Sequence, residues 1–222
     1  MKVPDIFIPE KDLGQNIESL LKVKRFSIPE YKIIKSKTYA KGIAKLKEQG
    51  KMPFTFAENI EARIIDYTTN CEDAELFRIW LDSVTGIAYK AKSTKFKLIL
   101  RSDKLENIKS VFSRNFVPVE YSAEKGIEFD SRKGKYNQNL TREEAKSHKF
   151  WLELMNGNKE RLAEYVDIWF DKTGKEKGMG IFLRNNTTED ELYSLPFDFY
   201  GDSDANGNSI LDYKVRFIFS TQ

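Results

Sequence analysis

The chain has 222 residues, of which 40% are hydrophobic and 32% are charged, and its formal net charge at pH 7 is +3. This length fits one domain or two small ones, and an aromatic content of 13% excludes a disordered chain, because disordered segments are poor in aromatic residues. So small a net charge does not by itself imply a nucleic-acid or membrane partner.

Cys71 is the sole cysteine of the sequence, which excludes an intrachain disulfide and makes a reducing cytoplasm the simplest setting. The first thirteen residues lack the apolar run of a signal peptide. No window approaches the roughly eighteen apolar residues of a membrane span. We therefore expect a cytoplasmic protein without a membrane partner.

The first part of the chain mixes extended and helical patterns. The expected elements are a short strand at 3–8, a helix over 13–21, an extended segment at 26–34, a basic helix over 39–46, and a helix over 60–67. Gly50 follows the basic helix and can adopt the left-handed conformation that ends a helix. Thr55 and Glu58 form an S/T-x-x-E capping box before the next one.

The stretch from Asp73 to Arg101 is the part on which we expect the rest of the chain to pack. Its first half places apolar residues at the spacing of one helix face: Phe77, Trp80, Leu81 and Val84. Gly86 would end this helix. The run from Lys95 to Leu100 then predicts a strand of a basic hairpin.

The second half continues with short elements. An ambiguous segment at 102–115 favours a helix, 116–121 and 127–129 predict strands, and Pro118 places the first of these strands at a sheet edge. A polar loop covers 133–139. We then expect one helix from the capping box of Thr141 and Glu144 to Met155, a helix capped by Asn158, strands at 181–184, 196–200 and 210–220, and a helical turn at Thr188.

Strands at both ends of the chain and helices in its middle do not follow the regular alternation of a doubly wound fold. The predicted fold class is therefore α+β, with helices clustered around a mainly antiparallel sheet. We expect residues 1–222 to form a single domain, and a weak subdivision near 131–140 is the alternative.

Positive charge is concentrated in two stretches. Lys22–Lys51 contains ten basic residues against two acids, and the hairpin carries lysines without an acid between Thr85 and Leu100. The candidate residues for binding nucleic acid or another anion are Lys41, Lys45, Lys90, Lys92, Lys95, Lys97 and Arg101. The alternative is a solvated surface, in which strand lysines only prevent edge-to-edge pairing.

The turn at 202–208 contains oxygen ligands at alternate positions, namely Asp202, Asp204 and Asn206, with Gly207 next. This is the front half of a calcium-binding loop, but Tyr213 occupies the position of its bidentate glutamate. The alternative is an ordinary polar turn. Calcium is thus one ion that the sequence would accommodate.

Asp198, Asp212 and Lys214 form the candidate catalytic set. Two carboxylates on paired strands can hold Mg²⁺, and a neighbouring lysine can stabilise phosphate charge. The arrangement is similar to the loose signature of the restriction-endonuclease-like nucleases, an Asp followed on the next strand by Asp-x-Lys, and this similarity implies a Mg²⁺-dependent nuclease. The alternative is a strand with one wet face.

No convincing catalytic constellation is present. We expect the single histidine, His148, to be structural and the three tryptophans, Trp80, Trp151 and Trp169, to pack in the core. The sequence therefore predicts a non-catalytic binding or assembly protein that requires no cofactor. Its basic face would contact an anionic partner, either nucleic acid or an acidic protein.

Overall fold

The computed structural model describes residues 31–70, 74–109, 116–197, 204–207, 211 and 214–221. The strand expected at 3–8 and the helix expected over 13–21 lie outside these residues, as does Cys71. Among the described helices, none is long and apolar enough to span a bilayer.

The elements, in chain order, are β1 (Tyr31–Ser36), α2 (Tyr39–Glu48), α3 (Phe56–Asn70), the 3₁₀ helix η2 (Glu75–Arg78), β2 (Gly86–Tyr89), β3 (Lys95–Ile99), α4 (Asp103–Glu106), β4 (Val117–Pro118), β5 (Ile127–Asp130), α5 (Arg142–Ser147), α6 (Lys149–Leu154), α7 (Lys159–Thr173), β6 (Ile181–Phe182), β7 (Glu191–Ser194), β8 (Ala205–Asn206) and β9 (Val215–Ser220).

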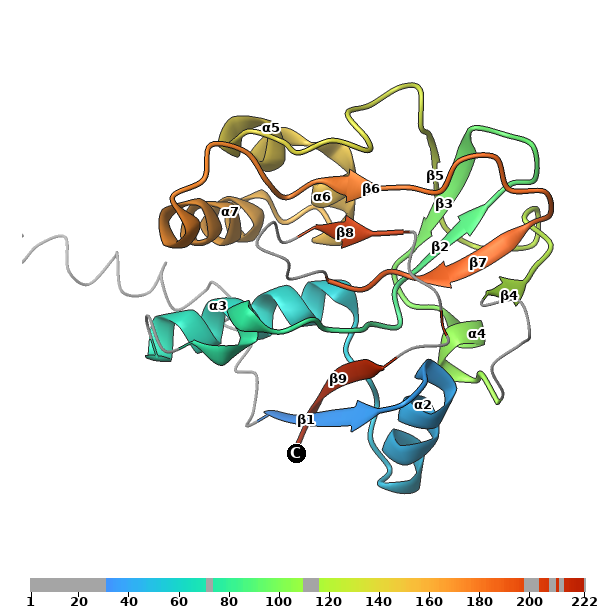
Figure 1. Ribbon diagram of the computed structural model, residues 1–222, viewed down its shortest axis with the longest axis horizontal. Helices are drawn as coiled ribbons and strands as arrows, with labels where there is room; N and C mark the ends of the chain where they lie inside the picture. The colour runs from blue at the N-terminus through green and yellow to red at the C-terminus, as the bar shows by residue number, and fades with distance from the viewer. Residues whose placement is uncertain are drawn as a thin grey trace, which may run out of the picture.

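Most strand pairs are antiparallel. Five strands form one sheet in the order β4-β7-β2-β3-β5, and β1 pairs with β9 from Tyr31 opposite Ser220 to Ser36 opposite Val215. A short parallel pair joins β6 and β8. These pairings, with strands from both ends of the chain side by side, confirm the α+β prediction (Figure 1). Pro118 lies on the edge strand β4, as predicted.

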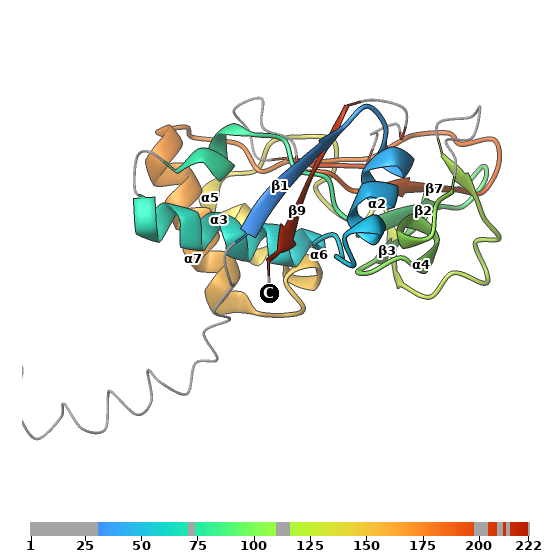
Figure 2. The same ribbon diagram turned by 90° about the horizontal axis from the view of Figure 1, so that it is seen from below.

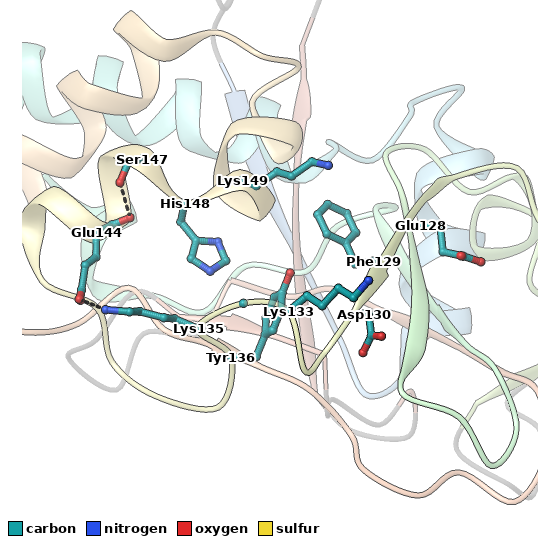
Figure 3. Close-up of a pocket in the computed structure, with 11 residues that line it drawn as sticks. Glu128, Phe129, Asp130, Lys133, Lys135, Tyr136, Glu144, Ser147, His148 and Lys149 are labelled. Atoms are coloured by element: carbon teal, nitrogen blue, oxygen red, sulfur yellow. Dashed lines mark hydrogen bonds and ion pairs between the residues drawn. The ribbon is translucent and has the colours of Figure 1, made fainter.

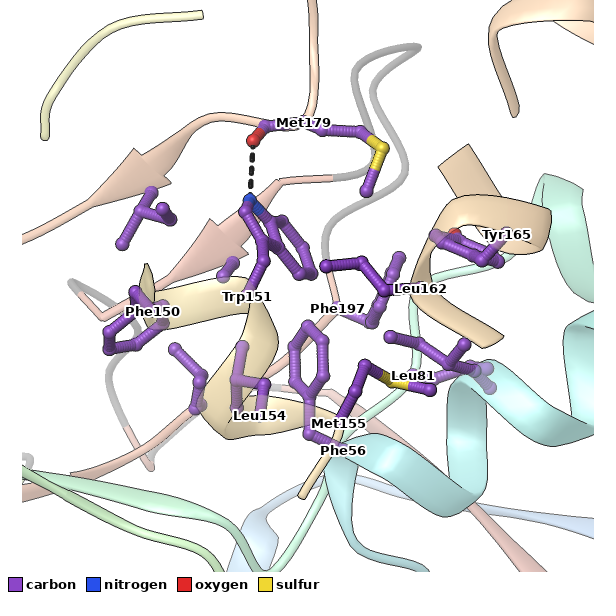
Figure 4. Close-up of a cluster of buried hydrophobic side chains, with 14 of the residues drawn as sticks. Phe56, Leu81, Phe150, Trp151, Leu154, Met155, Leu162, Tyr165, Met179 and Phe197 are labelled. Atoms are coloured by element: carbon purple, nitrogen blue, oxygen red, sulfur yellow. Dashed lines mark hydrogen bonds between the residues drawn. The ribbon is translucent and has the colours of Figure 1, made fainter. Parts of the chain in front are cut away.

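The helices pack on both sides of the strands. Figure 2 shows the β1–β9 ribbon lying across α3, with α2 beside it, while α5, α6 and α7 lie beyond α3 (Figure 1). Trp151 is fully buried in the larger core cluster, and its indole N–H donates to the Met179 carbonyl at 2.9 Å (Figure 4). Trp169 is also buried, whereas Trp80 is only half-buried.

Several helix ends follow the local signals. The Thr55 N–H donates to Glu58 Oε2 at 2.6 Å and the Glu58 N–H donates to Thr55 Oγ1 at 3.3 Å, which completes the capping box. The Asn158 side chain accepts from the Arg161 N–H at 3.0 Å at the start of α7. Gly50 has a φ of 64°, in the left-handed region. These three predictions are confirmed.

The helix expected from Thr141 to Met155 is in fact two helices, which meet at His148. The capping box of Thr141 and Glu144 is present. His148 then leaves the helical conformation, and its Nδ1 accepts from the Phe150 N–H at 3.2 Å. The structural role of His148 is confirmed, but the sequence pattern did not reveal this break, because the apolar spacing continues across it.

The helix predicted over Phe77–Val84 is wrong. Only η2 is helical, Leu81 forms an isolated antiparallel bridge with Phe197, and Gly86 begins a strand instead of ending a helix. Residues 81–89 are all buried. A segment surrounded on all sides has no solvent face, so its apolar spacing carries no information about a helical period.

The buried segment 81–85, which we call the hub segment, obtains its hydrogen bonds from distant elements. The Asp82 N–H donates to the Arg216 carbonyl at 2.7 Å, and the Arg216 N–H donates to Asp82 Oδ2 at 2.8 Å. The Tyr39 hydroxyl donates to the Ser83 carbonyl at 2.8 Å. Ser83 Oγ donates to the Leu195 carbonyl at 2.7 Å. The hub segment therefore connects α2 and β9 with the end of β7.

One prediction between β6 and β9 also fails. A strand, β7, forms at Glu191–Ser194, and the helical turn predicted at Thr188 is absent. Of the strand predicted at 196–200, residues 198–200 lie outside the described residues, and Phe197 forms isolated bridges with Leu81 and Ala205. The buried Glu191 carboxylate accepts from the Tyr193 hydroxyl at 2.8 Å. That bond allows a charged residue in a strand flanked by β4 and β2.

Thr85 provides a direct test of the hub segment. Its hydroxyl donates to the Leu100 carbonyl at 2.7 Å and accepts from the Phe56 N–H at 3.0 Å. Thr85→Val keeps the shape but leaves both backbone groups without this partner, so we expect the free energy of unfolding to fall by about 2–4 kcal/mol in urea titrations. Thr68→Val, on an exposed helix position, is the control, and an equal loss there would contradict the role of the hub.

His148 should make the protein sensitive to mild acid. Burial lowers the pKa of His148, and its hydrogen bond to the Lys135 backbone offsets only part of that effect. Below the ordinary histidine pKa of about 6.5 the unfolded chain binds a proton that the folded chain resists, so stability is lost as the pH falls.

Asn is a good helix cap and does not titrate, so the variant His148→Asn should retain the fold. We expect its stability to drop less than that of the wild type between pH 7.5 and 5.5, by at most about 1.4 kcal/mol. Chemical unfolding at the two pH values measures the difference. Equal drops in the two proteins would contradict the assignment.

Candidate functional site

The hairpin lysines on β3 are held by neighbouring groups. Lys95 Nζ lies 2.8 Å from Glu128 Oε1, and this hydrogen bond raises the pKa of Lys95 and lowers that of Glu128. Lys97 Nζ donates to the carbonyls of Tyr121 at 2.9 Å and Glu124 at 2.8 Å, and lies 4.6 Å from the centroid of the Tyr121 ring. Both side chains therefore serve the packing of β3 against β5 and the 121–124 turn.

Arg101 is engaged in the same way. Its guanidinium pairs closely with Glu106, lies 3.7 Å from Glu58, and donates to the Pro53 carbonyl at 3.4 Å. Three of the predicted anion-binding residues, on β3 and just after it, thus have intramolecular partners. A ligand would have to compete with those partners for them.

Lys90 and Lys92 lie at the exposed turn of the hairpin. Lys92 has a φ of 50°, and its N–H donates to the Thr187 carbonyl at 2.9 Å. The turn is fixed further by Asp190, which no sequence motif indicates. Its Oδ1 accepts from the Ala91 N–H at 2.8 Å and its Oδ2 accepts from the Tyr121 N–H at 2.9 Å. One carboxylate therefore joins the hairpin turn to the segment that follows β4.

A second group of cations lies on the β1–β9 ribbon and α2. We call this group the ribbon–helix surface; its exposed members are Lys32, Lys35, Lys37, Lys41, Lys45 and Lys214. Lys41 and Lys45 were predicted as anion-binding residues, whereas Lys214 was predicted as a catalytic one. Lys32, Lys35 and Lys37 belong to the basic stretch Lys22–Lys51 but were not among the predicted anion-binding residues.

Backbone contacts bring two pairs of these lysines together. Lys45 Nζ donates to the Lys35 carbonyl at 3.2 Å, which ties the outer face of α2 to β1. Val215 pairs with Ser36, so Lys214 and Lys37 lie at the same end of the ribbon. This proximity of residues 37 and 214 is a property of the tertiary fold, and sequence distance could not reveal it.

The ribbon–helix surface has little negative charge to neutralise it. Residues 31–51 contain seven lysines and a single acid, Glu48. In the part of the chain that the structure describes, Lys32, Lys35, Lys37, Lys41 and Lys214 form no ion pair. The ribbon–helix surface therefore differs from β3, where Lys95 pairs with the Glu128 carboxylate.

The metal and catalytic candidates fall mostly outside the described residues. Asp198, Asp202 and Asp212 are not described, and Lys214 is exposed at the start of β9. Asp204 Oδ1 accepts from the Gly180 N–H at 2.7 Å, and Asn206 pairs with Phe182 in the parallel strands β6 and β8. Among the described residues there is no group of three or more potential metal ligands. The calcium and nuclease hypotheses stay predictions.

Neither a protein-family model nor a curated protein matches this sequence. One solved structure with a similar fold carries the description "Accommodation of massive sequence variation in Nanoarchaeota by the C-type lectin fold". The similarity has a TM-score of 0.66 and covers 86% of this chain and 98% of that chain, at 17% sequence identity. The chain has a C-type lectin-like fold. At this identity the similarity establishes the fold only, since one fold can carry unrelated functions.

Removing the Asp190 carboxylate should loosen the hairpin turn. Asp190→Ala leaves the N–H groups of Ala91 and Tyr121 without their partner, and we expect a loss of about 1.5–3 kcal/mol in the free energy of unfolding. Glu176→Ala, at an exposed loop position, should change stability by less than about 0.5 kcal/mol. Hydrogen exchange of the Ala91 and Tyr121 amides would report the same change locally, and unchanged exchange would contradict it.

Proposed function

We propose that this chain is a non-catalytic binding domain whose ribbon–helix surface contacts an anionic partner. The observation that carries the proposal is the set of five exposed lysines on β1, on α2, between these two elements and just before β9 that form no ion pair with a described residue. Clustered cations without counter-charges attract polyanions, and binding releases the counterions of the partner.

The rigidity of this surface supports the proposal. The ribbon carries six paired positions, and the edge of the Tyr39 ring on α2 meets the Phe217 ring on β9 at a centroid distance of 5.0 Å. The backbone positions of lysines on such packed elements are fixed, so a partner that binds has only their side chains to order.

The fold is consistent with a binding role. The similar structure is described in terms of a C-type lectin fold that accommodates massive sequence variation, and the two chains keep the fold at 17% identity. A scaffold that tolerates such divergence can change its surface while its core is maintained, so each chain can recognise its own partner.

The proposal predicts salt-dependent binding that depends on these lysines. The test protein carries Lys35→Ala and Lys41→Ala, and the matched control carries Lys109→Ala and Lys159→Ala, two exposed lysines elsewhere in the described chain. Duplex DNA titrations at several salt concentrations measure the slope of log K against log salt. We expect the test pair to reduce the magnitude of this slope by about 1.8, because each phosphate that a lysine neutralises contributes about 0.9.

A parallel titration with polyglutamate distinguishes an acidic protein from a nucleic acid as the partner class. Binding that weakens in the test pair, and not in the control pair, supports the proposal. Failure of both polyanions to bind at low salt, or equal weakening in the two variants, would overturn it.

A further inference from the structure

A pocket of about 420 Å³ opens between β5, the loop after it, α5 and the start of α6 (Figure 3). Pockets of this size hold small organic molecules. In Figure 1, α5 and β5 lie toward the top of the view and β1 lies at the bottom, so the pocket is separate from the ribbon–helix surface.

The carboxylates that line the pocket already have cationic partners. Glu128 pairs with Lys95, Asp130 with Arg132 at 2.9 Å, and Glu144 with Lys135. The hydrogen bonds of Glu144 to Lys135 and to the Thr141 backbone lower its pKa to about 2, so it remains ionised. These acids are therefore not available to neutralise another cation.

Two further lysines line the same pocket and lack such partners. Lys133 and Lys149 are exposed and form no ion pair within the described part of the chain. Lys149 Nζ lies 5.7 Å from the centroid of the Phe129 ring, and Figure 3 shows the Lys133 side chain extending toward the strand segment of Phe129 and Asp130. The pocket wall itself carries three lysines and three carboxylates, and the partners Lys95 and Arg132 add two further positive charges beside the aromatic surface.

The rings of Phe129, Tyr136 and His148 form the remaining wall, and Phe96 contacts the first two of them. Tyr136 meets the edge of His148 at a centroid distance of 5.4 Å and that of Phe96 at 5.5 Å, and Phe129 stacks on Phe96 at 5.4 Å. These contacts hold the rings in fixed orientations. A planar group can therefore pack against Phe129 and Tyr136 without reorganising them.

The Tyr136 hydroxyl is a further ligand group. It forms no hydrogen bond with any described residue, and Figure 3 shows it pointing into the space between His148 and Phe129. Burial and the charge of Asp130 raise the pKa of Tyr136 to about 12, so the hydroxyl is a donor at neutral pH.

We propose that this pocket binds a small organic anion, with a planar ring against Phe129 and Tyr136 and a carboxylate or phosphate group between Lys133 and Lys149. The two lysines neutralise the anionic group, and the Tyr136 hydroxyl donates a hydrogen bond to it. This site shares no residue with the ribbon–helix surface, so it stands independently of the proposed function.

The test uses phenyl phosphate as the probe, with benzoate, inorganic phosphate and phenol as comparison compounds, in calorimetric titrations of the full chain. We expect saturable binding of phenyl phosphate, or of benzoate if the site prefers a carboxylate. Inorganic phosphate and phenol each lack one half of the ligand and should bind at least about tenfold more weakly.

Three variants assign the site. Lys133→Met with Lys149→Met should weaken the binding of the preferred probe at least about tenfold, and Tyr136→Phe should weaken it by a smaller factor. Lys109→Met with Lys159→Met, two exposed lysines that do not line the pocket, removes the same charge elsewhere and should leave binding unchanged. No saturable binding of either aromatic anion, or equal weakening in the pocket and control variants, would overturn the proposal.

Discussion

The structure depends on a buried segment whose backbone is neither helix nor sheet over most of its length. The hub segment from Leu81 to Thr85 cannot satisfy its polar groups within itself, and burial prevents water from doing so. Tyr39, Arg216 and Leu195 supply the partners. Because these residues come from α2, β9 and the end of β7, the segment can be buried only when all three elements are in place.

The elements joined by the hub segment also differ in whether their lysines have intramolecular partners. The hub leads into β2, and β2 pairs with β3, whose Lys95 and Lys97 bind neighbouring groups as the sheet closes on β5. Arg216 of β9 also bonds to the hub, and the lysines of the ribbon–helix surface have no carboxylate partner among the described residues. The predicted basic face is therefore divided into a structural part and an available part.

The sequence patterns succeeded where the physics is local. Capping boxes at Thr55 and Thr141 depend on residues three positions apart, and Pro118 lies at a sheet edge because it lacks an N–H. The sequence patterns predicted a helix that does not form at Val84 and missed the helix break at His148. Val84 has no solvent face, and the His148 side chain interrupts a helix without changing the apolar spacing.

By itself the sequence determined the fold class, most helix starts and the concentration of lysine near β1, because composition, caps and periodicity act over a few residues. Only the tertiary structure decided which lysines are neutralised, and it alone brought Lys214 to the end of the ribbon that carries Lys37. It also assembled the pocket of Lys133 and Lys149 around rings from β5, the loop after it and His148. These ion pairs and this pocket depend on residues that are distant along the chain, so a local sequence pattern cannot predict them.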